Sequence, residues 1–302
     1  MGYRRSRPLH LAGLSLMLGL AACGGDDTGP SSSSITEDDA PTIGQAVIAN
    51  VYASASGLAN YEFNIAGPSL AIARSGFATR SFARAFFSED SCPSFLPDPF
   101  PDADADGIPD NTTFSFDSAT CDQDFEDGSV NYSGNVIVSD PGTTLGYDLV
   151  IDDLTITVTP NLGDPESIRW GGGRSLRGGP NSLSLEEAFE FTYYADGSPL
   201  VLLRTAWDVE FVADDPGSIT EVGALPDGDL TVDGGFDVEG PGDRFLLVID
   251  TVSPLQYDAT CLDFVGGTIR AYARGREEEG AVQVTFNACG VEPSIIYVSG
   301  PA

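Results

Sequence analysis

The chain has 302 residues, with 14 arginines and lysines against 46 aspartates and glutamates, and its formal net charge is −32. A chain of this sign repels nucleic acid and anionic lipid headgroups, which excludes both as direct binding partners of its folded part. The length is sufficient for one large domain or two modest ones.

Residues 1–22 have the features of a secretory signal peptide. Three arginines between residues 4 and 7 precede an apolar run at residues 9–20, which is too short to span a bilayer as a helix. The run ends in Leu-Ala-Ala-Cys at residues 20–23. This ending resembles the bacterial lipobox, which implies cleavage after residue 22 and lipidation of Cys23.

The lipobox resemblance also indicates a location. Several acyl chains on Cys23 would hold the protein stably at a membrane, whereas a single chain holds a protein only marginally. Gly24, rather than aspartate, follows the cysteine, and in Gram-negative sorting this implies the outer membrane. We therefore expect a lipid-anchored protein of the cell envelope, facing either the periplasm or the cell surface.

Removal of the signal peptide restricts the available chemistry. The mature chain keeps 11 arginines and 46 acidic residues, for a net charge of about −35, and loses its only histidine, His10. With no histidine and no lysine it cannot build a Ser-His-Asp triad, a histidine-ligated zinc site or a Schiff base. A carboxylate pair of the glycosidase kind is still possible, but an enzymatic role is not favoured.

The first third of the mature chain divides into two segments. Residues 23–41, rich in Gly, Ser, Asp and Thr, are predicted to form a flexible tether with a reach of about 25 Å. Residues 42–90 form a helical or mixed lead-in, in which residues 69–87 fit a helix or a strand equally well. The predicted amphipathic helix has Thr42 as its N-cap and its apolar residues at Ile43, Val47, Val51, Ala55 and Leu58.

Residues 91–302 are predicted to form a β-rich domain. Short runs rich in β-branched and aromatic residues alternate with Gly, Pro and Asp turns. Asp196-Gly197 and residues 275–280 are typical of hairpin turns. The fold class is therefore mainly β, an antiparallel meander, curved sheet or sandwich with a short N-terminal helical segment. The predicted strands are Val130–Val138, Tyr147–Thr159, Glu187–Tyr194, Leu200–Val212, Arg244–Val252, Gly267–Ala273, Ala281–Phe286 and Ile295–Val298.

Four further cysteines, Cys92, Cys121, Cys261 and Cys289, are expected to form disulfides in an exported protein. Three pairings are possible. We favour Cys92 with Cys121 and Cys261 with Cys289, because the two intervals are nearly equal and each second cysteine ends an aromatic strand. The alternative is a bond that joins the two units.

This arrangement resembles a group of uncharacterised β-rich bacterial outer-membrane or surface lipoproteins that have a Cys-hairpin-Cys unit near each end of a long antiparallel meander. The resemblance extends over residues 90–300 and implies the fold rather than an activity. It includes a central segment with Arg169, Trp170, Arg174 and Arg177. Guanidinium contacts and ring stacking could let these residues bind an anion or a sugar. The alternative is a strand followed by a glycine loop whose arginines pair with local carboxylates.

Residues 102–110 read Asp-Ala-Asp-Ala-Asp-Gly-Ile-Pro-Asp. They resemble the calcium loops of thrombospondin type 3 repeats, and less closely an EF-hand, since Thr113 stands where an EF-hand has glutamate. The resemblance implies a structural calcium ion; the alternative is a solvated acidic turn. The expected ligands are the carboxylates of Asp102, Asp104, Asp106 and Asp110 and the main-chain carbonyl of Ile108.

These features predict a membrane-tethered lipoprotein of the cell envelope, stabilised by calcium and disulfides, with a non-enzymatic binding or structural role. A glycan or a protein is the expected partner beyond the membrane. Two alternatives remain open: a carboxylate-dependent glycan hydrolase, and a carrier that holds an apolar ligand inside a curved sheet.

Overall fold

The computed structural model describes residues 34–59, 93–97, 101, 103, 110–125, 128–142, 145–161, 164–219, 224–240 and 244–300. They form two helical elements and thirteen strands, all strands belonging to one sheet. The elements are η1 (Glu37–Asp39), α2 (Ala40–Ala59), β1 (Ser94–Leu96), β2 (Thr112–Phe116), β3 (Asp122–Phe125), β4 (Gly128–Ser139), β5 (Leu145–Pro160), β6 (Glu166–Gly178), β7 (Ser182–Ala195), β8 (Ser198–Ala213), β9 (Gly228–Glu239), β10 (Arg244–Asp258), β11 (Asp263–Ala273), β12 (Ala281–Thr285) and β13 (Ser294–Val298).

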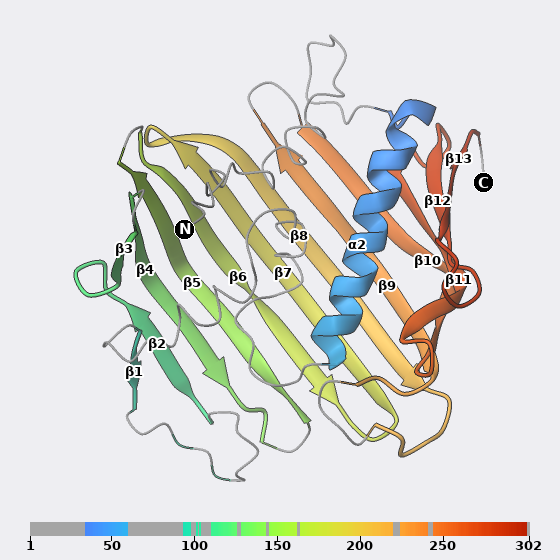
Figure 1. Ribbon diagram of the computed structural model, residues 1–302, viewed down its shortest axis with the longest axis horizontal. Coiled ribbons are helices and arrows are strands. Elements are labelled where there is room, and N and C mark those ends of the chain that lie inside the picture. The colour runs from blue at the N-terminus through green and yellow to red at the C-terminus, as the bar shows by residue number, and fades with distance from the viewer. Residues whose placement is uncertain are drawn as a thin grey trace, which may run out of the picture.

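The sheet is an antiparallel meander, which confirms the predicted fold class. From β4 to β13 each strand pairs with the next in the chain, and β2 and β3 both pair with β4. Figure 1 shows the strands side by side from β1 to β13. The predicted hairpin at Asp196-Gly197 connects β7 to β8, and residues 274–280 connect β11 to β12. Since every described strand lies in this one sheet, the described chain is not a sandwich.

The strands β6 and β9 are the longer ones that the sequence analysis does not predict, because glycine is depleted in strands. Gly172 in β6 has a φ of +125°, and a Cβ there would lie 2.2 Å from the carbonyl oxygen of Ala188. Gly234 in β9 has a φ of +152°, and a Cβ there would lie 2.1 Å from the carbonyl oxygen of Ala206. These glycines thus allow the backbones of neighbouring strands to approach closely inside the sheet. The glycine loop that one alternative expected after Trp170 is wrong, because these residues continue β6.

The helix α2 confirms the predicted helical segment but begins earlier. Thr36 is the N-cap of η1 and forms a capping box with Asp39, whose Oδ2 accepts the Thr36 backbone N–H at 2.9 Å; the Thr36 hydroxyl also donates to this oxygen, at 2.7 Å. The predicted cap, Thr42, lies inside α2. The reason is Pro41, which is well tolerated in the first turn of a helix. Residues from Ser34 onward therefore belong to the folded body rather than to the tether.

α2 covers one face of the sheet, here called the inner face. The helix contacts β7, β9, β11, β12 and β13, and Figure 1 shows it lying across the strands of the C-terminal half. The predicted apolar side of the helix is the buried one; Leu58, for example, is 0% exposed. The buried residues of this side are Ile43, Val47, Val51, Ala55 and Leu58.

The strands alternate between the two faces, as the period of two requires. In β8, buried residues such as Trp207 and Phe211 point to the inner face, whereas Arg204, Asp208 and Glu210 are exposed on the opposite, outer face. Trp207 is thus part of the core. One face of the sheet is thus apolar and covered, and the other is polar and exposed to solvent.

Substitution of Gly172 tests the close approach of β6 and β7. Gly172→Ala should lower the free energy of unfolding by about 1–3 kcal/mol, because it adds a strained φ and a steric clash. The matched control is Gly171→Ala, whose Cβ would meet only the Ile151 carbonyl oxygen, at 3.8 Å. Urea denaturation measures both; equal stability of the two variants would contradict this role of Gly172.

Candidate functional site

The predicted ligand contacts do not form one surface. All four lie on β6, whose side chains alternate between the faces of the sheet. Arg169 is exposed and Arg177 half-buried on the outer face, whereas Trp170 and Arg174 are buried on the inner face. Trp170 therefore lies among core residues, whereas Arg169 and Arg177 lie beside carboxylates of the outer face.

Trp170 packs into an aromatic cluster of the core. Its ring is stacked on Phe191 at a centroid distance of 5.3 Å and meets Phe189 edge-on at 5.6 Å. Only 2% of its surface is exposed. A ring enclosed in this way stabilises the packing of β6 and β7 and is not presented to solvent for a sugar to stack on.

Arg174 forms a buried ion pair with Glu187. Its Nε and Nη2 donate to Glu187 Oε2 at 3.1 and 2.7 Å, and its Nη1 donates to the hydroxyl of Tyr147 at 3.4 Å. The two charged side chains are 3% and 1% exposed. Burial raises the pKa of the Glu187 carboxyl, and Arg174 acts in the opposite direction. Glu187 Oε1 makes no hydrogen bond in the described part of the chain.

The two outer arginines of β6 pair with carboxylates of β5. Arg177 Nη2 donates to both carboxylate oxygens of Asp148, at 2.7 and 2.8 Å, and Arg169 donates to Asp153. A hydrogen bond between a guanidinium and a carboxylate is stronger than one between neutral groups. Both guanidinium groups are thus held by the protein itself, as one of the alternatives read from the sequence expects.

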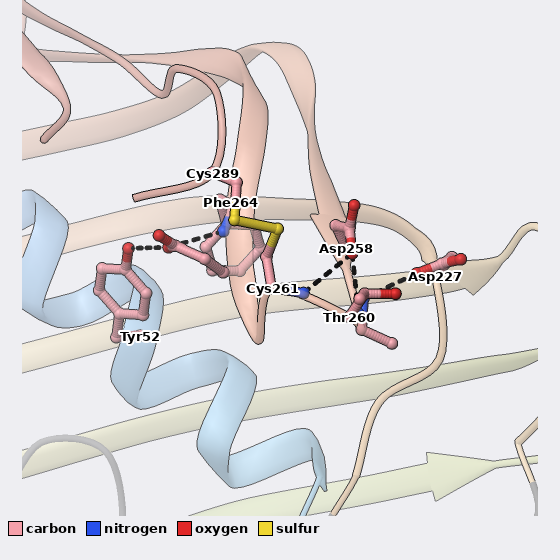
Figure 2. Close-up of a disulfide and its surroundings, with 9 residues drawn as sticks. Tyr52, Asp227, Asp258, Thr260, Cys261, Phe264 and Cys289 are labelled. Carbon is pink, nitrogen blue, oxygen red and sulfur yellow. Dashed lines mark hydrogen bonds between the residues drawn. A yellow bond between two sulfur atoms is a disulfide. The ribbon is translucent and has the colours of Figure 1, made fainter. Parts of the chain in front are cut away.

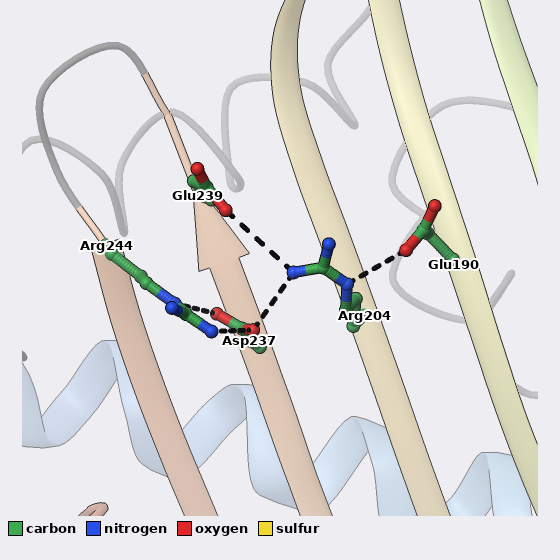
Figure 3. Close-up of polar contacts among 5 residues, drawn as sticks. All are labelled: Glu190, Arg204, Asp237, Glu239 and Arg244. Carbon is green, nitrogen blue, oxygen red and sulfur yellow. Dashed lines mark hydrogen bonds and ion pairs between the residues drawn. The ribbon is translucent and has the colours of Figure 1, made fainter.

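A second charge network crosses four strands of the outer face. Arg204 lies 2.8 Å from Glu190, 3.3 Å from Asp237 and 3.8 Å from Glu239, and Arg244 donates to both oxygens of Asp237 at 2.9 and 2.7 Å. Figure 3 shows Arg204 between the carboxylates of β7 and β9. The hydrogen bond from Arg244 is the main cause that lowers the pKa of Asp237. The network therefore ties β7, β8, β9 and β10 together.

One predicted disulfide pair is confirmed. Cys261 and Cys289 are bonded to each other, with Cα atoms 5.9 Å apart (Figure 2). Because Cys261 is bonded to Cys289, the alternative in which Cys261 pairs with the other unit is ruled out. Cys121 is also disulfide-bonded. Cys92 lies outside the described residues, so its pairing with Cys121 stays a prediction.

Most of the predicted calcium loop and the lipidation site lie outside the described residues. Of the expected ligands, the structure describes only Asp110; its Oδ1 accepts a hydrogen bond from the Ala103 N–H at 3.2 Å, and its own N–H donates to the Pro101 carbonyl at 2.9 Å. Cys23, Asp102, Asp104, Asp106 and Ile108 are not described. Within the described ranges, no group of three or more acidic, Cys or His side chains is positioned to hold a metal ion.

The partners of these arginines are not identifiable from the sequence alone. Glu187 stands directly opposite Arg174 across β6 and β7, and Asp237 stands opposite Arg204 across β8 and β9. The sequence signal is a charged residue on the apolar face of a strand, which applies to Glu187 in the alternation of β7. The partner is identifiable only once the register is known, since cross-strand neighbours are far apart in sequence.

Comparison with known proteins gives no match: no family model, no curated protein and no solved structure matches the chain. Among the described residues, no helix combines the length and the apolar character needed to cross a membrane.

Removal of one partner of the buried pair tests its energetics. Glu187→Leu should lower the free energy of unfolding by about 3–5 kcal/mol, because Arg174 stays charged and buried without a partner. The double variant Arg174→Met with Glu187→Leu should lose much less, since apolar side chains of similar volume replace both charges. The control Asp148→Asn, at a half-exposed pair, should change stability by less than about 1 kcal/mol. Urea denaturation distinguishes the cases, and a double variant no more stable than Glu187→Leu would refute the account.

Proposed function

We propose that this protein is a lipid-anchored lipoprotein of the bacterial cell envelope, at the outer membrane, with a binding or structural role. Cys23 carries the anchor in this proposal, and the acidic body stands off the membrane because its charge repels anionic headgroups. The proposal rests on the lipobox at residues 20–23 and on how the folded body begins.

The observation that carries the proposal is the fixed start of the folded body. Ile35 is 3% exposed, and its carbonyl accepts a hydrogen bond from the hydroxyl of Tyr297 in β13 at 3.2 Å. A tether from Cys23 therefore has to reach only as far as Ser34, and a random coil of that length spans about 18 Å. The edge of the sheet formed by β13 would then be the part of the body nearest the anchor.

The outer face of the sheet supports a role in binding a glycan or a protein. Its arginines on β6 and β8 are engaged by carboxylates, while hydroxyl side chains line β5 and its neighbours. Thr155 stands beside Ser133, and Thr157 stands between Asn131 and Ser167. Neutral donors and acceptors in rows suit a partner that is itself neutral and rich in hydrogen-bonding groups.

Calcium is the cofactor of the proposal, held by Asp102, Asp104, Asp106, Asp110 and the carbonyl of Ile108. The two hydrogen bonds between Asp110 and residues 101 and 103 support it, because a calcium loop needs its two ends close together. The ion would act as a structural clamp before β2, since every proposed ligand belongs to the protein.

Replacement of the lipidated cysteine tests the anchor. Cys23→Ser should release the protein from the membrane into the soluble fraction, because the acyl chains are its only proposed attachment. Fractionation with immunoblotting measures the distribution, and unchanged circular dichroism serves as the control for folding. A Cys23→Ser protein that still sediments with the membranes would refute the proposed anchor.

Removal of carboxylates tests the calcium loop. In wild type, calcium should raise the melting temperature and chelation should lower it, because an ion that binds only the folded state stabilises that state. Asp104→Ala combined with Asp106→Ala should abolish the calcium dependence. The control is Asp208→Ala combined with Glu210→Ala, two exposed outer-face carboxylates, which should retain it. A wild type that is insensitive to calcium would remove calcium from the proposal.

A further inference from the structure

The hairpin of β11 and β12 is closed by its turn at one end and by the disulfide at the other. The paired residues run from Tyr272 with Ala281 to Thr268 with Thr285, and one further hydrogen bond, from the Phe286 N–H to the Gly267 carbonyl at 3.0 Å, extends the pairing. Beyond it the two strands diverge. The covalent link between Cys261 and Cys289 then holds this open end together.

The same open end forms part of the surface on which α2 packs. The ring of Tyr52 in α2 lies 5.6 Å from Phe264 of β11 and 6.3 Å from Phe286, which follows β12; these two rings are 5.5 Å apart. The Tyr52 hydroxyl donates to Asp263 Oδ1 at 2.5 Å. Tyr52 therefore bridges the β11 side and the β12 side of the hairpin. The residues that it contacts lie within three positions of Cys261 or of Cys289 in the chain.

The two sides of the disulfide are held differently. On the β11 side, Asp258 Oδ1 accepts from the N–H groups of Thr260 and Cys261 at 2.8 and 3.0 Å, and Asp227 Oδ1 accepts from the Ala259 N–H at 2.7 Å. Figure 2 shows these carboxylates beside Cys261. In addition, Asp263 and Phe264 are paired with β10.

On the other side, Cys289 lies in an exposed turn after β12. The backbone contact of this turn is local, from the Val291 N–H to the Ala288 carbonyl at 3.0 Å. The Cys261 side is therefore fixed to β10, whereas the turn that carries Cys289 is held by the disulfide and, at its base, by the pairing of Thr285 with Ser294. Breaking the bond leaves Asp263 and Phe264 in place and frees the turn between Phe286 and Ser294 from the β11 side.

We infer that the Cys261–Cys289 disulfide is a redox-sensitive lock on the docking of α2. A thiolate of a dithiol reductant attacks the Sγ of Cys289, a residue in an exposed turn, forms a mixed disulfide and displaces the thiolate of Cys261. The second thiol of the reductant then closes its own disulfide and releases Cys289. The reductant is oxidised by two electrons, and both cysteines become thiols. Without the bond, Phe286 is held beside Phe264 only by the hairpin pairing that ends at Gly267, so the Tyr52 contact surface opens more easily and α2 loosens from β12 and β13.

Hydrogen exchange on the purified full chain tests this inference. In the double variant Cys261→Ser with Cys289→Ser, amides of residues 47–55 in α2 should exchange at least tenfold faster than in wild type. Amides of β7 and β8, in the middle of the sheet, should change by less than twofold, because their hydrogen bonds do not involve the hairpin. Dithiothreitol should reproduce the effect in wild type and add nothing to α2 exchange in the double variant, which separates this bond from that of Cys121.

Each outcome decides the inference. Unchanged exchange in α2 would overturn it, and so would equal acceleration in α2 and in β7 and β8, since the bond would then stabilise the whole fold. If the double variant does not fold, stepwise reduction of oxidised wild type gives the same comparison. Tyr52→Phe keeps the ring contacts and removes the bond to Asp263, and it should accelerate α2 less than reduction does.

Discussion

The structure depends on covering the inner face of a single sheet. Almost every strand from β4 to β12 contributes buried apolar side chains to that face, and an antiparallel sheet with one apolar face is stable only when another layer covers it. α2 supplies this layer for the C-terminal half, where it lies across the part of the sheet from β7 to β13. The helix has the length and composition that such a covering layer needs, with twenty residues, one continuous apolar side and small residues around it.

The alternation of the two faces also determines what the charged residues can do. The glycines of β6 continue the strand without a break. Arg169 and Trp170 therefore point to opposite faces of the sheet although they are adjacent in the chain. The arginines are accordingly used one by one: Arg174 inside the core with Glu187, and Arg177 and Arg204 outside, across strand boundaries. Arg204 lies between carboxylates of β7 and β9, Glu190, Asp237 and Glu239, which would otherwise face one another without a cation.

Sequence patterns were sufficient for the elements with a clear period. The spacing of Ile43, Val47 and Val51 predicts α2, and β-branched runs predict eight of the strands. The patterns did not predict β6 and β9, where Gly172 and Gly234 allow neighbouring backbones to approach closely, because sequence rules treat glycine as a turn residue. The candidate site was less predictable than the fold: which carboxylate an arginine meets depends on register, and register appears only after the strands are assembled.

The hydrogen bond from Tyr297 to Ile35 joins positions that are 262 residues apart. The entry of the chain into the folded body is therefore fastened to the last strand of the sheet. Any pull on the N-terminal segment reaches α2 and β13 first, at the edge of the sheet, and not the long strands in its middle. Mechanical load would thus peel the sheet from β13 inward, with β1 and β2 at the opposite edge as the last strands to yield.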